Sequence, residues 1–179
     1  MKEIETLESR IVYQNKWMSV REDKIRRASG AEGIYGVVDK ADYVIILPIQ
    51  DGYIHLVEQY RYPVEQRFWE LPQGSWEGNP DADHTTLAAG ELQEETGLVA
   101  KQMDYLGHQY HGYGYSSQGF HIYLATDLTM SSPSLDPEEE GLVSKKFSLI
   151  EFEEMIMAGV IKDAATINAY GLAKLKGLI

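Results

Sequence analysis

The sequence of 179 residues contains no cysteine. This absence excludes disulfide bonds, zinc–thiolate sites and thiol nucleophiles. Long apolar runs are also missing, since the longest, residues 43–49, is far below the roughly 20 residues that a membrane helix requires. The first ten residues are charged and lack the apolar core of a signal peptide. We therefore expect a cytoplasmic protein that does not bind a membrane.

Positive charge is scarce and unevenly spread. The chain has 16 lysines and arginines against 28 aspartates and glutamates, which gives a net charge of −12. Such an excess disfavours binding to nucleic acids and to anionic membranes. No lysine or arginine occurs between residues 68 and 100. Seven acids occur there: Glu70, Glu77, Asp81, Asp83, Glu91, Glu94 and Glu95. A phosphate-rich substrate would be repelled by them unless a cation intervenes.

The chain has the length of one domain with its own core, and its first third is predicted to form β-strands. Valine, isoleucine and tyrosine are frequent there between turn residues. Strands are predicted at residues 9–13, 18–26, 34–39, 43–49, 53–60 and 68–71, and later at 103–109 and 119–125. Asp51-Gly52 predicts a tight hairpin between two of them, because both residues tolerate a positive φ.

Helices are predicted in three places by their end signals. Asp83 and Gly97 are suitable caps for a helix over residues 84–96. A capping box that begins at Ser148 starts a second helix, and Asp163 caps a third one that extends to about residue 176. Strands with interspersed helices and no regular βαβ repeat indicate an α/β or α+β sandwich.

Three glutamates gather on one side of the helix predicted over residues 84–96. Glu91, Glu94 and Glu95 share an arc of about 100° on a regular helix. Like charges at these spacings each cost about 0.2–0.5 kcal/mol, and no lysine compensates them. Carboxylate oxygens without histidine or cysteine favour Mg²⁺ or Mn²⁺ over zinc. The spacing indicates a metal site, and a solvated acidic face stays open as the alternative.

Residues 74–98 resemble the Nudix box, G-x5-E-x7-R-E-U-x-E-E-x-G-U, where U is a bulky aliphatic residue. The second half of the box matches in full from Glu91 to Leu98. The first half is two residues longer than the pattern and has no glutamate at the first glutamate position. The acids nearest to that position are Glu77, Asp81 and Asp83. Gly90 replaces the arginine that helps to orient a box glutamate in the family. A mid-helix glycine costs up to about 1 kcal/mol, so we expect close packing or room for another group there.

The segments around the box resemble the ADP-ribose pyrophosphatase branch of that family. They are EQYRYP at 58–63, WELPQG at 69–74 and IKDAAT at 161–166. The resemblance covers about residues 40–178. It implies an α/β/α sandwich with a mixed central sheet in residues 41–179. It also implies an N-terminal antiparallel β segment in residues 1–40 that pairs two subunits into a homodimer.

The same resemblance implies an enzyme that hydrolyses a nucleoside diphosphate sugar with the help of Mg²⁺, or alternatively Mn²⁺. ADP-ribose, cleaved to AMP and ribose 5-phosphate, is the leading substrate. One alternative keeps the reaction and changes the substrate to a GDP- or UDP-sugar, a dinucleoside polyphosphate or NADH. The other is a Nudix-fold binding module with little turnover, because the box arginine and first glutamate are missing.

The metal ligands implied by the resemblance are Glu91 and Glu95. Glu94 is expected as a further ligand or as the residue that orients a metal-bound water. The backbone carbonyl of Gln73 is expected to add another ligand, since the family residue before the box glycine does so.

A further acid is expected from the loop before the last strand. The family pattern places Glu140 and Glu138 at its acidic positions, where a catalytic base would stand. A solvated loop is the competing interpretation for this run of glutamates.

Contacts to the substrate are expected from residues on either side of the box. Arg61 is the predicted phosphate ligand, because arginine can engage phosphate through two hydrogen bonds. An ion pair with Glu58 is the alternative for this side chain. Glu70 and Gln118 are also expected at the substrate, and Gln118 stands where the branch has a glutamate.

Aromatic residues and histidines complete the set of candidates. Trp17 is expected to stack on the base, and Trp69, Tyr60 and Tyr62 are further candidates, with core packing as the alternative. His108 and His111 are expected to be half-buried polar residues of a strand and a loop, with contact to the substrate as the alternative.

Overall fold

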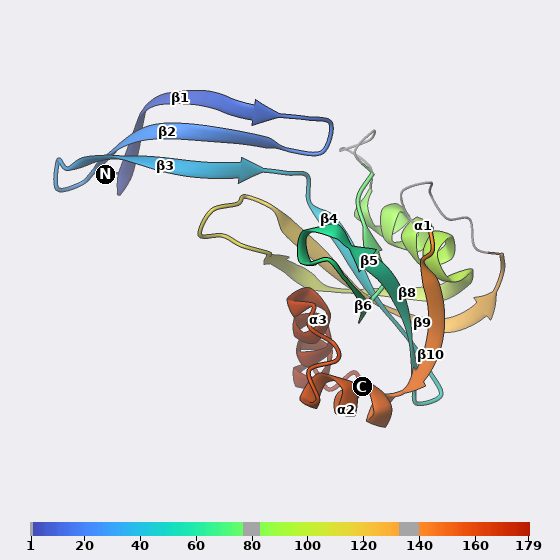
Figure 1. The fold of residues 1–179 in the computed structure, drawn as a ribbon. Helices are drawn as coiled ribbons and strands as arrows, with labels where there is room; N and C mark the ends of the chain where they lie inside the picture. The colour runs from blue at the N-terminus through green and yellow to red at the C-terminus, as the bar shows by residue number, and fades with distance from the viewer. Residues whose placement is uncertain (1, 77–82, 133–139) are drawn as a thin grey trace.

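The computed structural model describes residues 2–76, 83–132 and 140–179. Glu77, Asp81 and Glu138 lie outside the described residues. The N-terminal part forms a sheet of its own, with three antiparallel strands in sequence order. The strands are β1 (Ile4–Gln14), β2 (Ser19–Arg27) and β3 (Glu32–Asp39). In Figure 1 this sheet extends to one side of the other elements.

The rest of the chain is built on a mixed sheet of seven strands. They are β4 (Tyr43–Gln50), β5 (Tyr53–Arg61), β6 (Gln66–Glu70), β7 (Gln73–Gly74), β8 (Leu98–Tyr110), β9 (Gly119–Met130) and β10 (Val143–Ser148). The order across the sheet is β10-β5-β4-β9-β8, with β6 beside β5 and β7 beside β4. β4 and β9 run parallel, and the other pairs are antiparallel. The predicted mixed sheet is thereby confirmed.

The three predicted helices are present with the predicted caps. They are α1 (His84–Thr96), α2 (Leu149–Met157) and α3 (Ala164–Leu175), and a short 3-10 helix, η1 (Tyr62–Val64), follows β5. Asp83 and Asp163 each accept a hydrogen bond from a backbone N–H in the first turn. Both hydrogen bonds of the capping box at Ser148 are made. Gly97 ends α1 with φ of 71°, the left-handed conformation that glycine adopts without strain.

The central sheet is covered on both faces, because successive residues of β4 point in opposite directions. Val44 and Ile46 pack with Leu92 of α1 in one buried cluster. Ile45 packs with Phe152 of α2 in a second cluster, which also contains residues of α3. The predicted α/β/α sandwich is therefore confirmed (Figure 1).

Some predicted element limits and contacts differ from those observed. β1 begins at Ile4 rather than at residue 9 because ion pairs hold its polar start against β2. Lys24 contacts Glu8 at 2.6 Å and Arg26 contacts Glu5 at 3.5 Å. Ala89 of α1 is exposed, since the buried side of the helix is occupied by its neighbours.

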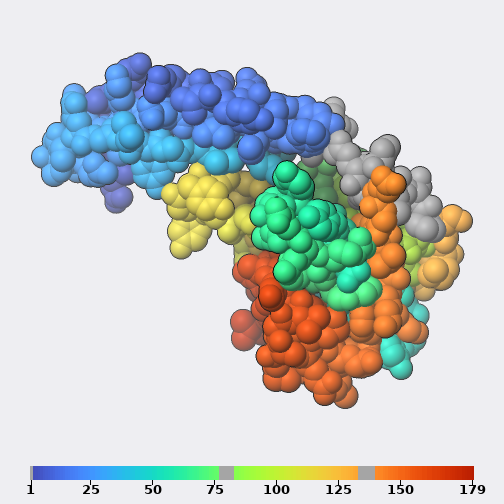
Figure 2. Space-filling model, viewed as in Figure 1, coloured from blue at the N-terminus to red at the C-terminus, as the bar shows by residue number. Residues whose placement is uncertain are grey.

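The N-terminal sheet joins the rest of the molecule along the loop before β9. The N–H of Val38 donates to the carbonyl of Tyr115 at 2.8 Å, and the hydroxyl of Tyr35 donates to the carbonyl of Gly114 at 2.9 Å. In Figure 2 this loop lies directly beneath the N-terminal sheet. Within the described residues, no helix is long and apolar enough to cross a membrane.

Candidate active site

The glutamates of α1 face a short strand at the centre of the molecule. Glu91 and Glu95 are almost fully buried, with 4 % and 2 % of their surface exposed, and Glu94 is half-buried. The backbone N–H of Gln73 donates to Oε2 of Glu95 at 3.1 Å. The acidic side of α1 is therefore packed against β7, so the alternative of a fully solvated acidic face is wrong.

Gly74 lets the backbone of β7 pass close to one of these carboxylates. A Cβ added to Gly74 would lie 2.5 Å from the carboxyl carbon of Glu91, a distance that no side chain tolerates. Two buried carboxylates thus converge on Gln73 and Gly74. Their oxygen donors fit a hard divalent cation such as Mg²⁺ or Mn²⁺. Burying an ionised acid costs free energy unless its charge is compensated, and a bound cation would compensate both.

Gly90 leaves space for an aromatic ring. A Cβ at this position would lie 2.6 Å from Cζ2 of Trp76. Trp76 also packs against the buried cluster between α1 and the sheet. The expectation of close packing at Gly90 is thereby confirmed, and an indole ring occupies the surface that the arginine of the box would take.

A cavity of about 630 Å³ opens beside β7. It is lined by Lys40, Tyr43, Arg61, Pro63, Val64, Phe68, Glu70, Gln73, Gly74, Ser75, His111, Gln118, Lys162 and Asp163. Glu91, Glu94 and Glu95 are not among these residues, but Glu91 and Glu95 contact Gly74 and Gln73, which belong to the wall. The volume falls within the range of about 300–1,000 Å³ that is usual for small-molecule sites.

Arg61 and Glu70 form an ion pair in this wall. Nε of Arg61 donates to Oε2 of Glu70 at 3.2 Å, and Nη2 donates to the other oxygen. Burial raises the pKa of Glu70, and the guanidinium acts against that rise. Burial alone would lower the pKa of Arg61, but Glu70 and then Glu95 raise it above its usual value.

The ion pair with Glu58, which is the alternative given for Arg61 above, is formed by Arg67 instead. Nε of Arg67 donates to Glu58 at 3.0 Å, and its Nη2 donates to the carbonyl of Gly141 at 2.7 Å. The interpretation of Arg61 as the partner of Glu58 is therefore wrong, because Arg67 on the antiparallel neighbour β6 takes that place. The guanidinium of Arg61 is left to face the cavity together with Glu70.

Both ends of the loop over residues 111–118 line the cavity. Nε2 of Gln118 donates to the carbonyl of Ala41 at 2.9 Å. Nδ1 of His111 lies 3.1 Å from the hydroxyl of Tyr43. Burial raises the pKa of Tyr43, which keeps this hydroxyl protonated. His111, for which a polar loop residue was the favoured interpretation, lines the cavity.

The other candidates lie elsewhere. Trp17 is exposed between β1 and β2, with the Nζ of Lys16 4.2 Å from its ring, and Tyr60 and Tyr62 are exposed as well. Trp69 packs edge-on against Phe147 in the core. Glu140 is exposed in the turn before β10 and is not among the residues that line the cavity. The roles of Trp17 and Glu140 remain predictions.

Sequence reasoning missed two cations of the cavity, Lys40 and Lys162, and two aromatic residues, Tyr43 and Phe68. Nζ of Lys162 lies 5.6 Å from the ring of Phe68. Lys162 could have been found, because it belongs to the segment 161–166 that resembles the ADP-ribose pyrophosphatase branch. Lys40 had none, because it sits between two sheets whose relative placement the sequence does not reveal.

Comparison with known proteins decides the family. Residues 39–170 match the model of the NUDIX domain, and residues 4–38 match that of the nucleoside diphosphate sugar hydrolase N-terminal domain. The chain belongs to the Nudix hydrolase family. This confirms the resemblance drawn from the box and its flanks. The division of the chain into an N-terminal β segment (residues 1–40) and a Nudix domain (residues 41–179) remains a prediction.

Relatives of this Nudix hydrolase are similar over nearly their whole lengths. An ADP-ribose pyrophosphatase of Mycobacterium tuberculosis (strain ATCC 25618 / H37Rv) is 30% identical over 167 residues, which cover 92% of this chain and 80% of the relative. An ADP-ribose pyrophosphatase of Bacillus subtilis (strain 168) is 26% identical and covers 98% of this chain and 96% of the relative. A crystal structure titled as an ADP compounds hydrolase superposes with a TM-score of 0.86 at 21% identity, covering 100% of this chain and 98% of that one. This last likeness shows that the fold is shared.

Proposed function

We propose that this Nudix hydrolase cleaves the diphosphate of ADP-ribose and releases AMP and ribose 5-phosphate. The observation that carries the proposal is that two buried carboxylates, Glu91 and Glu95, contact the β7 residues Gly74 and Gln73, which line a cavity together with Arg61, Lys40 and Lys162. The names of the two relatives as ADP-ribose pyrophosphatases support the choice of substrate.

Nudix hydrolases generally use a divalent metal, and we infer that this one uses Mg²⁺, with Mn²⁺ as a substitute. Glu91 and Glu95 would hold the ion together with Glu94 and the carbonyl of Gln73. All of these donors are oxygens, which both ions prefer. When bound there, Mg²⁺ would neutralise diphosphate oxygens and lower the pKa of a bound water.

The cationic side chains of the cavity are suited to the other end of the diphosphate. Arg61, Lys40 and Lys162 bring positive charge to a chain with a net charge of −12. Glu70 fixes the plane of the Arg61 guanidinium by two hydrogen bonds, so the remaining N–H groups keep a fixed direction. Gln118 would contact the sugar, where an amide can both donate and accept.

Glu94, Glu140 and Glu138 remain the candidates for accepting the proton of the attacking water. Trp17 lies in the connection between β1 and β2 and is not among the residues that line the cavity, so its stacking on the base rests on the family pattern. These assignments follow the family pattern.

The test is the release of AMP from a panel of substrates, measured with Mg²⁺. The panel contains ADP-ribose, a GDP-sugar, a UDP-sugar, a dinucleoside polyphosphate and NADH. ADP-ribose is expected to give the highest kcat/KM. Glu95→Gln should lower kcat by at least about 100-fold, because loss of one stabilising group costs that much.

Glu154→Gln is the matched control, because Glu154 is an exposed glutamate on α2. It should leave the rate unchanged. If ADP-ribose binds but no member of the panel is turned over, the chain is a binding module and the proposal fails. A higher kcat/KM for another member of the panel would overturn the choice of substrate alone.

We also propose that the N-terminal sheet pairs two chains into a homodimer. One of its faces carries the ion pairs of Arg10 with Glu22 and of Lys24 with Glu8. Ile4 and Ile11 lie on the other face and are 45% and 61% exposed. That face also carries the ion pair of Arg21 with Asp23, and the exposed isoleucines beside it are the part of the surface that we propose to join two chains. Sedimentation of the intact chain as a monomer would contradict this proposal. The expected cytoplasmic location remains a prediction that cell fractionation tests.

A further inference from the structure

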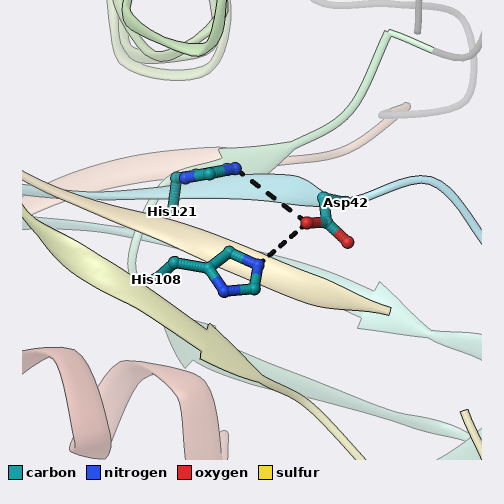
Figure 3. A group of neighbouring side chains, drawn as sticks. All are labelled: Asp42, His108 and His121. Atoms are coloured by element: carbon teal, nitrogen blue, oxygen red, sulfur yellow. Dashed lines mark hydrogen bonds and ion pairs between the residues drawn. The ribbon is translucent and has the colours of Figure 1, made fainter. Parts of the chain in front are cut away.

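Three side chains that the proposed reaction does not use converge on the face of the sheet that α1 covers. His108 of β8 and His121 of β9 stand directly opposite each other in the antiparallel pair. Val44 of β4 pairs with His121, and Asp42 lies two residues earlier on the same face. The register of three strands therefore brings Asp42, His108 and His121 together. Figure 3 shows both imidazoles directed at one oxygen of Asp42.

The distances between the three side chains suit a common metal ion. Oδ2 of Asp42 lies 2.9 Å from Nε2 of His108 and 3.9 Å from Nε2 of His121. All three ligand atoms lie within 4.8 Å of one another. Two ligands of a tetrahedral zinc ion, with bonds of about 2.0–2.1 Å, are about 3.3 Å apart. The observed separations bracket this value, so small rotations of side chains would complete the site.

Neighbouring groups hold the ligands in the required orientation. Nδ1 of His121 lies 3.2 Å from the hydroxyl of Tyr105, which leaves Nε2 directed at Asp42. Oδ1 of Asp42 accepts a hydrogen bond of 2.7 Å from the N–H of Gly119, which leaves Oδ2 for a ligand. A histidine that binds metal usually has its second ring nitrogen engaged in this way.

A glycine makes room for the second imidazole. A Cβ at Gly119 would lie 2.5 Å from Cε1 of His108, so only glycine allows this ring to lie over β9 and reach Asp42. The His84 ring at the start of α1 stacks on His121 with 4.1 Å between the ring centroids.

We propose that Asp42, His108 and His121 form a second metal site, which binds Zn²⁺ through two imidazoles and one carboxylate. Two nitrogen donors and one oxygen donor are the ligand type of zinc, whereas the glutamates of α1 offer oxygen alone. The three side chains remain 42%, 29% and 21% exposed, in the order named, which leaves the fourth position open to water. The site therefore differs in donor chemistry from the metal site proposed at Glu91 and Glu95, and it lies across β4 from Gly74, which contacts Glu91.

Co²⁺ is the probe for this site, because it takes the geometry of zinc and has a visible absorption spectrum that depends on coordination. The intact chain is titrated with Co²⁺ in excess Mg²⁺, which occupies oxygen-only sites. We expect an intense visible band that saturates at a single equivalent and is abolished by Zn²⁺. His108→Ala and His121→Ala should each weaken Co²⁺ binding by more than about 100-fold. Tyr105→Phe should weaken Co²⁺ binding by about tenfold, because it removes the hydroxyl that contacts the second ring nitrogen of His121.

Two controls separate this site from other histidines and from the active centre. His55→Ala removes a half-buried histidine of β5 and should leave the titration unchanged. Glu95→Gln removes a carboxylate of α1 and should also leave it unchanged. Asp42→Asn keeps the shape of the carboxylate, so it serves if an alanine variant loses its circular dichroism spectrum. A missing band, a band that survives loss of either histidine, or a band lost in Glu95→Gln would overturn the proposal.

Discussion

At Gly90 the backbone of α1 runs against the edge of the Trp76 ring, and this contact braces the helix that carries the acidic cluster. The indole fills the space that a side chain at residue 90 would need. Trp76 lies two residues after Gly74, so the same short segment contacts α1 at Glu91 and at Gly90. The orientation of the buried carboxylates therefore depends on a ring and a glycine that must be considered together.

Gly90→Ala should destabilise the fold by about 1 kcal/mol. Overpacking costs about 1–3 kcal/mol, and alanine returns about 1 kcal/mol of helix propensity. Urea unfolding measures the difference. Gly171→Ala is the matched control, since Gly171 lies in α3 with nothing within 4 Å of an added Cβ. That change should stabilise the chain by about 0.5–1 kcal/mol. If Gly90→Ala is stabilising too, the Trp76 contact does not constrain the helix.

Arg61→Lys should raise KM for ADP-ribose by about tenfold and change kcat less, because lysine cannot make the paired hydrogen bonds of a guanidinium. Steady-state kinetics of AMP release provide the measurement. Arg67→Lys is the control, because Arg67 makes a comparable ion pair with Glu58 on the neighbouring strand. An equal rise in KM for both variants would show that the effect is structural and not a loss of phosphate binding.

The residues of the active centre were predictable to different degrees. Glu91 and Glu95 follow from their spacing and the box, since a helix places such positions on one side whatever the rest of the chain does. Lys40 and Trp76 were not predictable, because their places depend on contacts between segments distant in the sequence. The cluster of Asp42, His108 and His121 was not predictable either, because it depends on the register of three strands.

At the level of elements, helix ends were predicted closely and strand lengths less so. A helix end is fixed by local groups, as at Ser148, whose side chain accepts from the N–H of Glu151. A strand continues as long as its partner does, and β8 and β9 pair from Leu98 to Tyr110 through many polar residues. No local sequence pattern predicts how long such a pair of strands is.

The start of α2 should depend on pH through its capping box. Hydrogen bonds from the side chain and then the backbone of Ser148 lower the pKa of Glu151 below 4.5. A lowered pKa in the folded state means that this contribution is present above pH 4.5 and is lost as the pH falls through the lowered value. The stability difference between the wild type and Glu151→Gln should therefore shrink below pH 4.5, as measured by urea unfolding at several pH values. A constant difference down to pH 3 would contradict it.

Ser148→Ala tests the same box from its other side. It should cost about 1 kcal/mol at neutral pH, the usual value of an N-cap. Ser144→Ala on β10, an exposed serine outside any cap, should change the stability by less than about 0.5 kcal/mol. Equal effects of the two substitutions would show that the cap adds nothing beyond an ordinary surface serine.

At the scale of the whole molecule, the exposed isoleucines of the N-terminal sheet lead to a prediction about assembly. Ile11→Lys puts a charge on the surface proposed to join two chains and should convert the dimer to a monomer in sedimentation velocity. Met157→Lys is the control, because Met157 is 79% exposed on α2, away from this sheet. If Ile11→Lys still sediments as a dimer, the chains associate through another surface.

The pairing of β4 with β9 has a consequence for how the chain reaches its fold. Tyr43 lies beside Phe120, so these strands meet only after the intervening segment has been made. The strands β1 to β3, in contrast, pair with their immediate neighbours in the sequence. Contacts between distant residues form slowly, whereas contacts between near ones form fast. During synthesis on the ribosome, the N-terminal sheet can close early, while β4, whose residues 44–49 are all buried in the folded chain, has only β5 and β7 beside it until β9 is made. Over that interval β4 exposes apolar side chains that a chaperone would protect.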